Sequence, residues 1–291
     1  MICVLLELHS KFKEIQEDNS VISKPSINLS ILVAVAQRDV APWREIRLYG
    51  QELTWVKHFR RSGVRVVYYL AQEPNAYQKM SHKYREFSRF RKYLGRIQGK
   101  IDKTLMKIVK FKEPDFKFLE ERYELHVSCP STYFKMHERN FALFKWFLEE
   151  NNEEFLFRTN TSSYLNQAAI SSYMNPIKNL SSFLGGTLSS EGEHGFISGA
   201  GILMPRQTIR EILKNWNMLE RHIIEDVALS RLSRRLGIPL IDLPRLDFNS
   251  PNLVERCDGN VLNSNFHFRC KGSIRPRQDI EIMKLLDAIL S

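Results

Sequence analysis

Short apolar runs alternate with amphipathic stretches along the first half of the chain. SILVAVAQ at 30–37 has the pattern of a buried strand, 42–63 that of a helix ending at Gly63, and 64–72 that of a second strand. Consecutive strands joined by helices pair in parallel, because the helical crossover returns the chain to the end of the sheet where the previous strand began. This alternation predicts an α/β fold with a mostly parallel central sheet flanked by helices.

The alternation continues toward the C-terminus, with glycine and proline at several element boundaries. We expect the last helix to pack against the core and the chain between 244 and 271 to be irregular, although 266–269 also fits an ordinary strand. No internal repeat is visible, so a single domain over 28–291 follows an N-terminal extension at 1–27. The remaining predicted elements are strands at 122–129, 154–159 and 195–204, and helices at 134–152, 163–174, 225–237 and 279–290, with a further helix opened by Pro205.

The composition is that of an ordinary globular protein, with 43% hydrophobic and 26% charged residues. A chain of 291 residues buries a core without disulfides or metals, which excludes peptide hormones and disulfide scaffolds. No run approaches the roughly 20 apolar residues of a membrane span. The 4 cysteines show no zinc spacing and the opening residues no secretory signal pattern, so we expect a cytoplasmic protein with free thiols.

The positive charge of the chain is concentrated in one segment. Lys and Arg number 43 against 33 Asp and Glu, and residues 79–112 alone hold 12 basic and 2 acidic side chains. Apolar residues recur there every three or four positions, which is the stripe of an amphipathic helix with a cationic far face. We therefore predict a basic helical insert at 78–117 within the domain.

The sequence leaves several interpretations of this insert open. Its apolar stripe packs on the domain while its charges are solvated, or its cationic face binds anionic lipid at a membrane surface. The alternative from another class is a nucleic-acid-binding protein whose segment 79–112 tracks phosphates. The aromatic residues lie on the apolar stripe and not among the cations, so stacking platforms for bases are not evident and no nucleic acid is expected.

Polar side chains gather where the predicted strands end, which is where parallel α/β sheets bind ligands. Each group also has a structural interpretation: a turn and helix cap for 160–163, favourable helix-dipole contacts for the acids at 225–226, and solvated charge for the arginines. The side chains concerned are Gln37, Arg38, Arg44, Arg47, Asn160, Thr161, Ser162, Ser163, Glu225, Asp226, His267, Arg269 and Lys271.

Taken in order, these pieces resemble the Fringe-like and galactosyltransferase-like inverting glycosyltransferases, which share the GT-A fold. The resemblance covers roughly residues 30–270, and its most specific part is the glycine-rich strand, helix and Glu-Asp-Val segment. The stretches that carry it are Arg44-Glu45-Ile46-Arg47, Tyr133 with Arg139, EFLFRTNTSSYLN, and FISGAGILMPRQTI followed by IIEDVALSRLSRRLGI.

The resemblance implies direct displacement of a nucleotide diphosphate from the anomeric carbon of a sugar. The acid of the Glu-Asp-Val segment is the general base on the acceptor hydroxyl, and this role falls on Asp226, while Glu225 binds the acceptor or orients its neighbour. The resemblance also implies a nucleotide-diphosphate sugar as donor, usually UDP-linked, and a glycan or glycolipid as acceptor. Retention of the Glu-Asp pair argues against a degenerate, inactive member of the fold.

One stretch departs from the family pattern. The metal-binding acids of Asp-x-Asp are replaced by Asn160-Thr161-Ser162, whose neutral oxygens bind Mg²⁺ or Mn²⁺ poorly compared with carboxylates. We therefore predict that cationic side chains neutralise the leaving diphosphate with little or no dependence on a metal. The candidate cations are Arg139, Arg158, His267, Arg269, Lys271 and Arg275.

Other positions are assigned from their place in the resemblance. Asn160 and Ser162 are expected to form a polar lining under the donor sugar and phosphates. Gln37 and Arg47 are expected near the base and ribose. Gly199 and Gly201 are expected to let the substrate approach the backbone closely.

Overall fold

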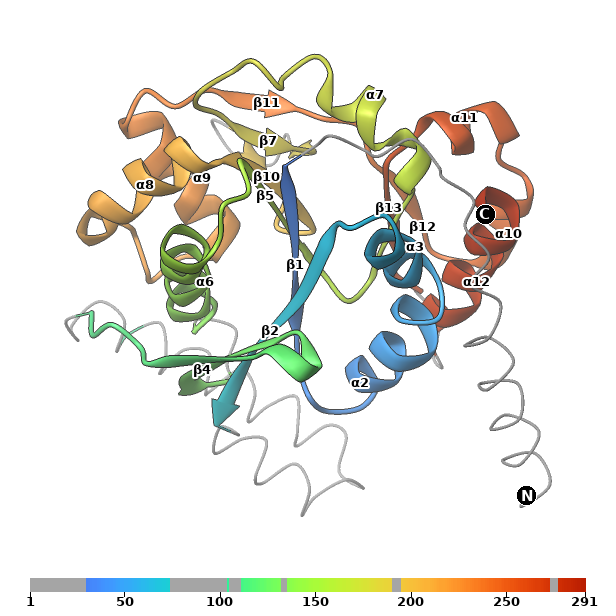
Figure 1. Cartoon of the computed structure of the whole chain (residues 1–291). Coiled ribbons are helices and arrows are strands. Elements are labelled where there is room, and N and C mark those ends of the chain that lie inside the picture. The colour runs from blue at the N-terminus through green and yellow to red at the C-terminus, as the bar shows by residue number, and fades with distance from the viewer. Residues whose placement is uncertain (1–29, 74–103, 105–110, 132–134, 190–194, 273–276) are drawn as a thin grey trace.

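A large, mostly parallel sheet forms the centre of the protein (Figure 1), which confirms the predicted fold class. The computed structural model describes residues 30–73, 104, 111–131, 135–189, 195–272 and 277–291. The sheet has eight strands in the order β11-β7-β10-β5-β1-β2-β4-β3, in which β10 and β3 run antiparallel to their neighbours. The strands are β1 (Ile31–Gln37), β2 (Arg65–Glu73), β3 (Phe116–Leu119), β4 (Glu124–Pro130), β5 (Phe155–Asn160), β7 (Leu184–Gly186), β10 (Gly201–Pro205) and β11 (Leu240–Asp242).

Helices cover both faces of this sheet and bury a separate apolar cluster on each (Figure 1). On one face lie α6 (Met136–Glu150), α8 (Arg206–Lys214) and α9 (Glu225–Arg235), whose apolar residues pack on the alternate side chains of β1 such as Leu32 and Ala34. The other face carries α3 (Trp55–Arg61) and α12 (Asp279–Leu290), and the latter packs on the core as predicted. Alternation of inward side chains along buried β1 therefore serves both cores.

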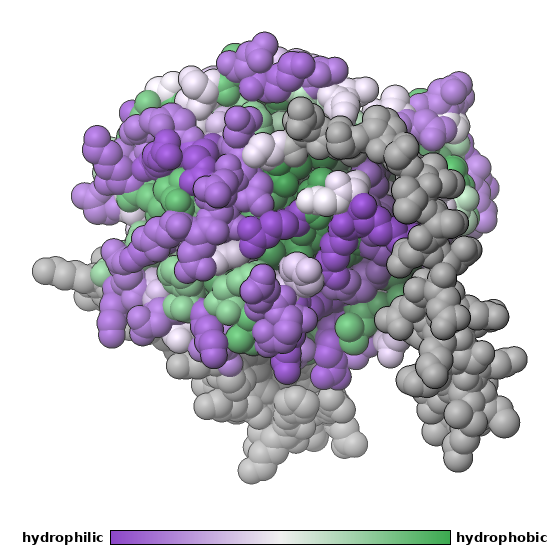
Figure 2. Space-filling view, in the orientation of Figure 1, coloured by the Kyte–Doolittle hydropathy of each residue, from purple (hydrophilic) through white to green (hydrophobic). Residues whose placement is uncertain are grey.

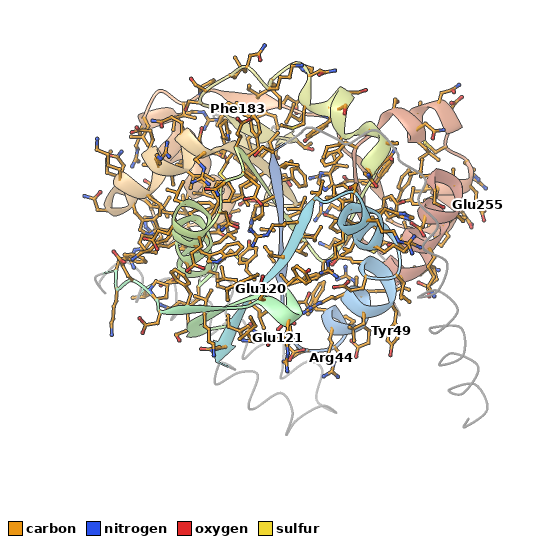
Figure 3. The ribbon with its side chains drawn as sticks, viewed as in Figure 1. Arg44, Tyr49, Glu120, Glu121, Phe183 and Glu255 are labelled. Atoms are coloured by element: carbon orange, nitrogen blue, oxygen red, sulfur yellow. The ribbon has the colours of Figure 1, made fainter. Side chains whose placement is uncertain are left out.

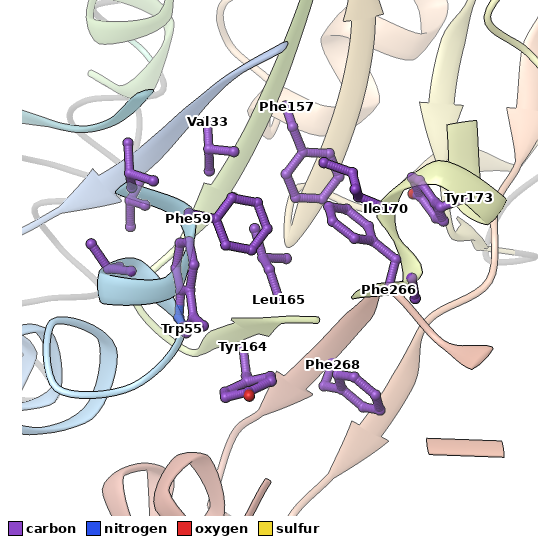
Figure 4. Packing of buried hydrophobic residues seen from close by; sticks show 14 of the residues in the cluster. Val33, Trp55, Phe59, Phe157, Tyr164, Leu165, Ile170, Tyr173, Phe266 and Phe268 are labelled. Atoms are coloured by element: carbon purple, nitrogen blue, oxygen red, sulfur yellow. The ribbon is translucent and has the colours of Figure 1, made fainter. Parts of the chain in front are cut away.

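An aromatic cluster joins the main sheet to a small second sheet (Figure 4). The second sheet has the order β12-β13-β6, with β12 (Leu246–Phe248), β13 (His267–Cys270) and β6 (Ser163–Leu165). Phe157 of β5 meets Phe266 at 5.2 Å between ring centroids, an edge-to-face contact that fixes how the two sheets meet. The remaining elements are α2 (Trp43–Glu45), η1 (Ile46–Gln51), η2 (Glu120–Arg122), η3 (Gln167–Ala169), α7 (Ile170–Met174), β8 (Leu188–Ser189), β9 (Phe196–Ile197), η4 (Trp216–Met218), α10 (Pro251–Glu255) and α11 (Gly259–Ser264).

Several predicted elements are divided in the structure. The helix expected at 42–63 breaks before Thr54, whose hydroxyl donates to the carbonyl of Gly50 at 2.6 Å and so competes with the helical backbone bonds. The start of the helix expected at 163–174 is strand β6, because it pairs with β13 across the small sheet. The region before Lys271, expected to be irregular, contains β12, α10, α11 and β13, so the alternative of an ordinary strand near 266–269 is the correct one.

Parts of the sequence interpretation fall outside the described residues. The N-terminal extension at 1–27, Tyr133 and Arg275 lie there, as does most of the basic segment 79–112. At the far end of the predicted insert 78–117, the chain joins the central sheet at Phe116, where β3 begins. The helical structure of the insert, with its charges on one face, stays a prediction.

Polar side chains cover much of the face shown in Figure 2, with apolar side chains in view between them near the middle. Exposed apolar side chains occur on η1, where Leu48 is 44% and Tyr49 54% exposed. Within the described ranges, none of the helices combines the length and the apolar character that crossing a bilayer requires.

Arg206, the first residue of α8, closes the C-terminal end of α6. Its guanidinium donates to the carbonyls of Phe147 at 3.2 Å and Leu148 at 3.2 Å, and also to those of Asn151 and Glu153. The last carbonyls of a helix lack partners within the helix and carry partial negative charge, so a cation is stabilising there.

Replacing Arg206 with leucine is expected to lower the free energy of unfolding by about 2–4 kcal/mol, because buried carbonyls lose a charged donor. Urea denaturation followed by circular dichroism measures this change. Arg210→Leu, at an exposed position of the same helix, is the control and should change stability by less than about 0.5 kcal/mol. Equal effects of the two substitutions would contradict the capping role.

Candidate active site

A cavity of about 330 Å³ lies at the carboxyl edge of the parallel strands. Strand β1 ends at Gln37 and β5 at Asn160, and Ala36 pairs with Asn160, so both strand ends open into the same space. Strand β10 runs the other way, and Gly201 at its start pairs with Thr159. An antiparallel strand thus brings the loop before it to the edge where the parallel strands end.

The cavity gathers most of the residues predicted from the sequence. Among the described candidates, Arg44, Arg47, Ser163, Gly201 and His267 do not line it. The predicted residues that do are Gln37, Arg38, Arg139, Arg158, Asn160, Thr161, Ser162, Gly199, Glu225, Asp226, Arg269 and Lys271. The further lining residues are Ala36, Trp43, Met136, Ser198 and Ala200.

Asp226 presents its carboxylate to the cavity from the first turn of α9. Oδ2 accepts the backbone N–H of Gly199 at 3.0 Å, and Oδ1 accepts that of Val227 at 3.0 Å. A carboxylate oxygen has more than one lone pair, so each oxygen keeps acceptor capacity while its direction is fixed. The side chain is half-buried, and its place on the cavity wall suits a group that takes a proton from a bound hydroxyl.

Glu225 is held inside a buried network behind Asp226. Its Oε1 accepts from Nδ2 of Asn140 at 2.6 Å, and its Oε2 accepts from Nη2 of Arg158 at 3.0 Å. Arg158 also donates from Nε to the hydroxyl of Tyr69 at 2.7 Å and from Nη1 to the carbonyl of Gly199 at 2.8 Å. With both oxygens engaged, Glu225 is suited to orient its neighbour, the second of the two roles expected for it.

Burial and charge oppose each other in this network. Burial raises the pKa of Glu225, and the guanidinium of Arg158 works against that rise. Burial would lower the pKa of Arg158, but the carboxylate of Glu225 and the hydroxyl of Tyr69 raise it above its ordinary value. Arg158 therefore stays charged, and its charge is paired within the protein with Glu225, the neighbour of Asp226.

The segment Asn160-Thr161-Ser162 forms a tight turn on the cavity floor. Oδ1 of Asn160 accepts the N–H of Ser162 at 3.0 Å, and the buried amide of Gln51 donates to the carbonyls of Asn160 at 3.2 Å and Ser163 at 3.1 Å. Gln51 ends the π-helical segment η1, whose wider turn places it under β5. Gln51 was not foreseen, because its role depends on this local irregularity.

The oxygens at this turn do not suit a divalent cation. The amide oxygen of Asn160 is engaged within the turn, and Oγ of Ser162 accepts from Nη2 of Arg277 at 2.9 Å, which places a positive charge beside it. Across the part of the chain that the structure describes, no group of three or more His, Cys, Asp and Glu side chains could hold a metal ion. Mg²⁺ and Mn²⁺ need carboxylate or other unengaged hard oxygens, and this site offers them a guanidinium instead.

Cationic side chains from the small sheet also line the cavity. Arg269 of β13 lies beside Asp247, with 3.5 Å between Nη1 and Oδ2, and Lys271 follows at the end of the strand. The positive charge of Arg269 lowers the pKa of Lys271, with smaller contributions from burial and Arg277. Cations close enough to perturb one another in this way form a natural site for a multiply charged anion.

Arg47 and His267 are engaged elsewhere. Arg47 forms an ion pair with Glu124 and stacks on the ring of Tyr68 at 3.9 Å, at the side of the sheet. Its partner in the sequence resemblance, Arg44, points away from the body of the protein (Figure 3) and is 55% exposed. His267 is buried with Nε2 3.1 Å from Oγ of Ser163, and burial holds its pKa well below the ordinary value, so it is neutral.

The two glycines expected to admit substrate also let protein groups approach the backbone closely, and Gly199 lines the cavity. A Cβ at Gly201 would come within 2.3 Å of the His267 ring. A Cβ at Gly199 would come within 3.1 Å of Oδ2 of Asp226 and 3.2 Å of Nη1 of Arg158. The absence of a side chain at Gly199 thus leaves room for the carboxylate of Asp226 and the guanidinium of Arg158, which both bond to its backbone.

Trp43 lines the cavity but has no role predicted from the sequence. It follows β1 by six positions, and its carbonyl lies 3.5 Å from Nε2 of Gln37. The guanidinium of Arg277 lies 4.4 Å from the centre of its ring. An aromatic side chain just beyond the carboxyl end of the first strand could have been noted as a candidate, whereas Arg277 depends on contacts that are distant in sequence.

No family model matches the chain, and no curated protein matches it by sequence. Among solved structures it is similar to a glycosyltransferase involved in the glycosylation of the major capsid of PBCV-1, with TM-score 0.47 and 11% identity over 88% of this chain and 99% of that one. It is also similar to the galactosyltransferase LgtC, with TM-score 0.41 and 8% identity over 90% and 96%. The third is the glycosyltransferase GlyE of Streptococcus pneumoniae TIGR4, with TM-score 0.38 and 11% identity over 90% and 63%. Scores and identities this low do not place the chain in a family.

Proposed function

We propose that the protein is a glycosyltransferase that moves a sugar, with inversion, from a nucleotide-diphosphate sugar to a hydroxyl of a glycan or glycolipid. The observation that carries the proposal is one cavity lined both by Asp226 and by the cations Arg269 and Lys271. A proton acceptor and cations in one cavity suit a reaction in which a hydroxyl loses its proton as a phosphate gains negative charge. The sequence resemblance to inverting glycosyltransferases supports the same assignment.

In the proposed reaction, the acceptor oxygen forms a bond to the anomeric carbon while the bond from that carbon to the diphosphate breaks. Asp226 takes the hydroxyl proton as the new bond forms, and the electron pair of the broken bond leaves on the diphosphate. Glu225 and Arg158 hold Gly199 and α9 so that the carboxylate keeps its direction. Charge on the departing diphosphate is balanced by the cations from the small sheet.

We propose UDP as the nucleotide of the donor, on the family resemblance alone. The expected positions for the donor are Gln37 near the base and Asn160 with Ser162 under the phosphates. The nucleic-acid alternative rests on 79–112, and no observation within the described ranges favours it. We also propose that the protein is located in the cytoplasm. Its basic insert is proposed to contact a membrane surface there.

We expect the enzyme to work without a divalent metal, because the turn at Asn160-Thr161-Ser162 meets a guanidinium where a cation would bind. A panel of UDP- and GDP-sugars should include one that raises the melting temperature, since a ligand that binds only the folded state stabilises it. EDTA should leave both this shift and the rate of sugar release unchanged. Activity that disappears with EDTA and returns with Mn²⁺ would refute metal independence, and a panel without any stabilising nucleotide would refute the proposed function.

A further inference from the structure

Arg277 lies at the entrance of α12 and reaches back to the cavity floor. Its Nε donates to Oδ1 of Asp279 at 2.8 Å, and its Nη2 bonds both Oδ2 of Asp279 and Oγ of Ser162. One face of the guanidinium covers the ring of Trp43, with 4.4 Å from its central carbon to the ring centre. Ser162 and Trp43 both line the cavity, so Arg277, which does not line it itself, contacts two of its lining residues.

The pairing with Asp279 fixes the guanidinium without using all of it. Asp279 is fully buried and also accepts the N–H of Gly272 at 3.2 Å, so it is a rigid anchor. These contacts occupy Nε and Nη2, and the remaining N–H donors of the planar group are on Nη1. Nη1 lies outside the edge that Asp279 occupies, and its two N–H groups can donate charge-assisted hydrogen bonds to the oxygens of an oxyanion.

The charge of the neighbourhood remains positive when Asp279 is counted. Arg277, Arg269 and Lys271 are close enough for both arginines to lower the pKa of Lys271. Of the two acids nearby, Asp279 pairs with Arg277, while Asp247 pairs with both Arg269 and a further arginine, Arg245. The four cations outnumber the two carboxylates, and this excess of positive charge favours an anion such as a phosphate group.

We propose that Arg277 binds the diphosphate of the nucleotide donor at the position of Ser162, as a specificity-determining contact that a nucleoside lacks. This inference rests on the proposed function and adds to it a residue from the C-terminal segment. The alternative is that Arg277 only ties α12 to the turn at 160–162. The two differ in what they predict for ligands with and without phosphate.

The test compares the binding of UDP and uridine, and of GDP and guanosine, by isothermal titration calorimetry. Arg277→Lys keeps a charge but loses the planar fork, and R277Q/D279N removes both charges so that no buried carboxylate is left unpaired. We expect both variants to bind the preferred diphosphate about tenfold more weakly or worse, with the affinity for its nucleoside unchanged within about twofold. Their melting temperatures are measured alongside.

The control is Arg60→Lys. Arg60 also pairs with an acid, Glu52 at 2.7 Å, and covers an aromatic ring, Tyr123 at 4.6 Å, but neither of these partners lines the cavity, unlike Ser162 and Trp43. It should leave diphosphate affinity unchanged. Wild-type affinity for the diphosphate in both Arg277 variants, or equal loss for nucleoside and diphosphate, would overturn the inference, whereas no binding of either diphosphate to the wild-type protein would refute the proposed function itself.

Discussion

Replacing Asp226 with asparagine is expected to lower kcat by ~10²- to 10⁴-fold while leaving the affinity for the sugar nucleotide nearly unchanged. The amide has nearly the shape of the carboxylate but keeps only one of the two backbone bonds, because its oxygen accepts one N–H while its NH2 group faces the other. It also does not accept a proton from the acceptor. A single-turnover assay of sugar transfer measures the rate, and calorimetry with the donor nucleotide measures the affinity.

The structural interpretation of Asp226, an acid that stabilises a helix start, is tested by a matched substitution. Asp258 precedes α11 and accepts the N–H of Asn260 at 2.7 Å, but it does not line the cavity. Both substitutions to asparagine should cost stability by about 0.3–1 kcal/mol, since each removes a negative charge from a helix N-terminus. Only Asp226→Asn should slow transfer, and equal turnover in the two variants would rule out Asp226 as the base.

Secondary structure could be predicted from the sequence where a single hydrophobic pattern runs through a whole strand or helix. Strand β1 and helix α6 were predicted nearly to their ends, because a continuous apolar run and a long amphipathic stripe have few other structures open to them. The prediction was wrong at β6, a strand of only three residues that is followed almost at once by the helical turns of η3 and α7. The pairing of β6 with β13 decides that structure, and such a contact between distant segments is not visible in local periodicity.

The residues of the candidate site likewise divide into those that sheet topology predicts and those that contacts between distant segments bring in. Residues at the carboxyl ends of β1 and β5 were predicted, because the topology of a parallel sheet brings these ends together whatever the details of packing. Arg47 does not line the cavity, because its ion pair with Glu124 holds it beside β4, and its expected contact with the donor stays a prediction. Gln51 and Arg277 reach the site through a π-helical turn and a buried partner respectively, and neither leaves a signature in sequence spacing.

Replacing Arg158 with methionine is expected to lower the free energy of unfolding by about 3–5 kcal/mol, because it leaves the buried carboxyl of Glu225 without its counter-charge. Arg158 is 2% exposed and Glu225 8%, so water does not take the place of the lost partner. The double variant R158M/E225Q removes both charges and should be more stable than the sum of the two single losses indicates. Urea denaturation of the wild type, the single variants and the double variant gives the coupling between the two side chains.

The pH dependence of the same variant separates an unpaired charge from a simple loss of packing. Burial raises the pKa of Glu225 in the folded protein, and without Arg158 nothing nearby opposes that rise as strongly. Above the ordinary glutamate value of about 4.3, the folded variant therefore holds a proton that the unfolded chain releases, so its stability falls as pH rises through this window. R158M should lose less stability at about pH 5 than at about pH 8, whereas R235M, which breaks the exposed pair with Glu220, should cost under about 1 kcal/mol at either pH. A loss in R158M that does not change with pH would mean that Arg158 matters for its packing and not for the charge it opposes.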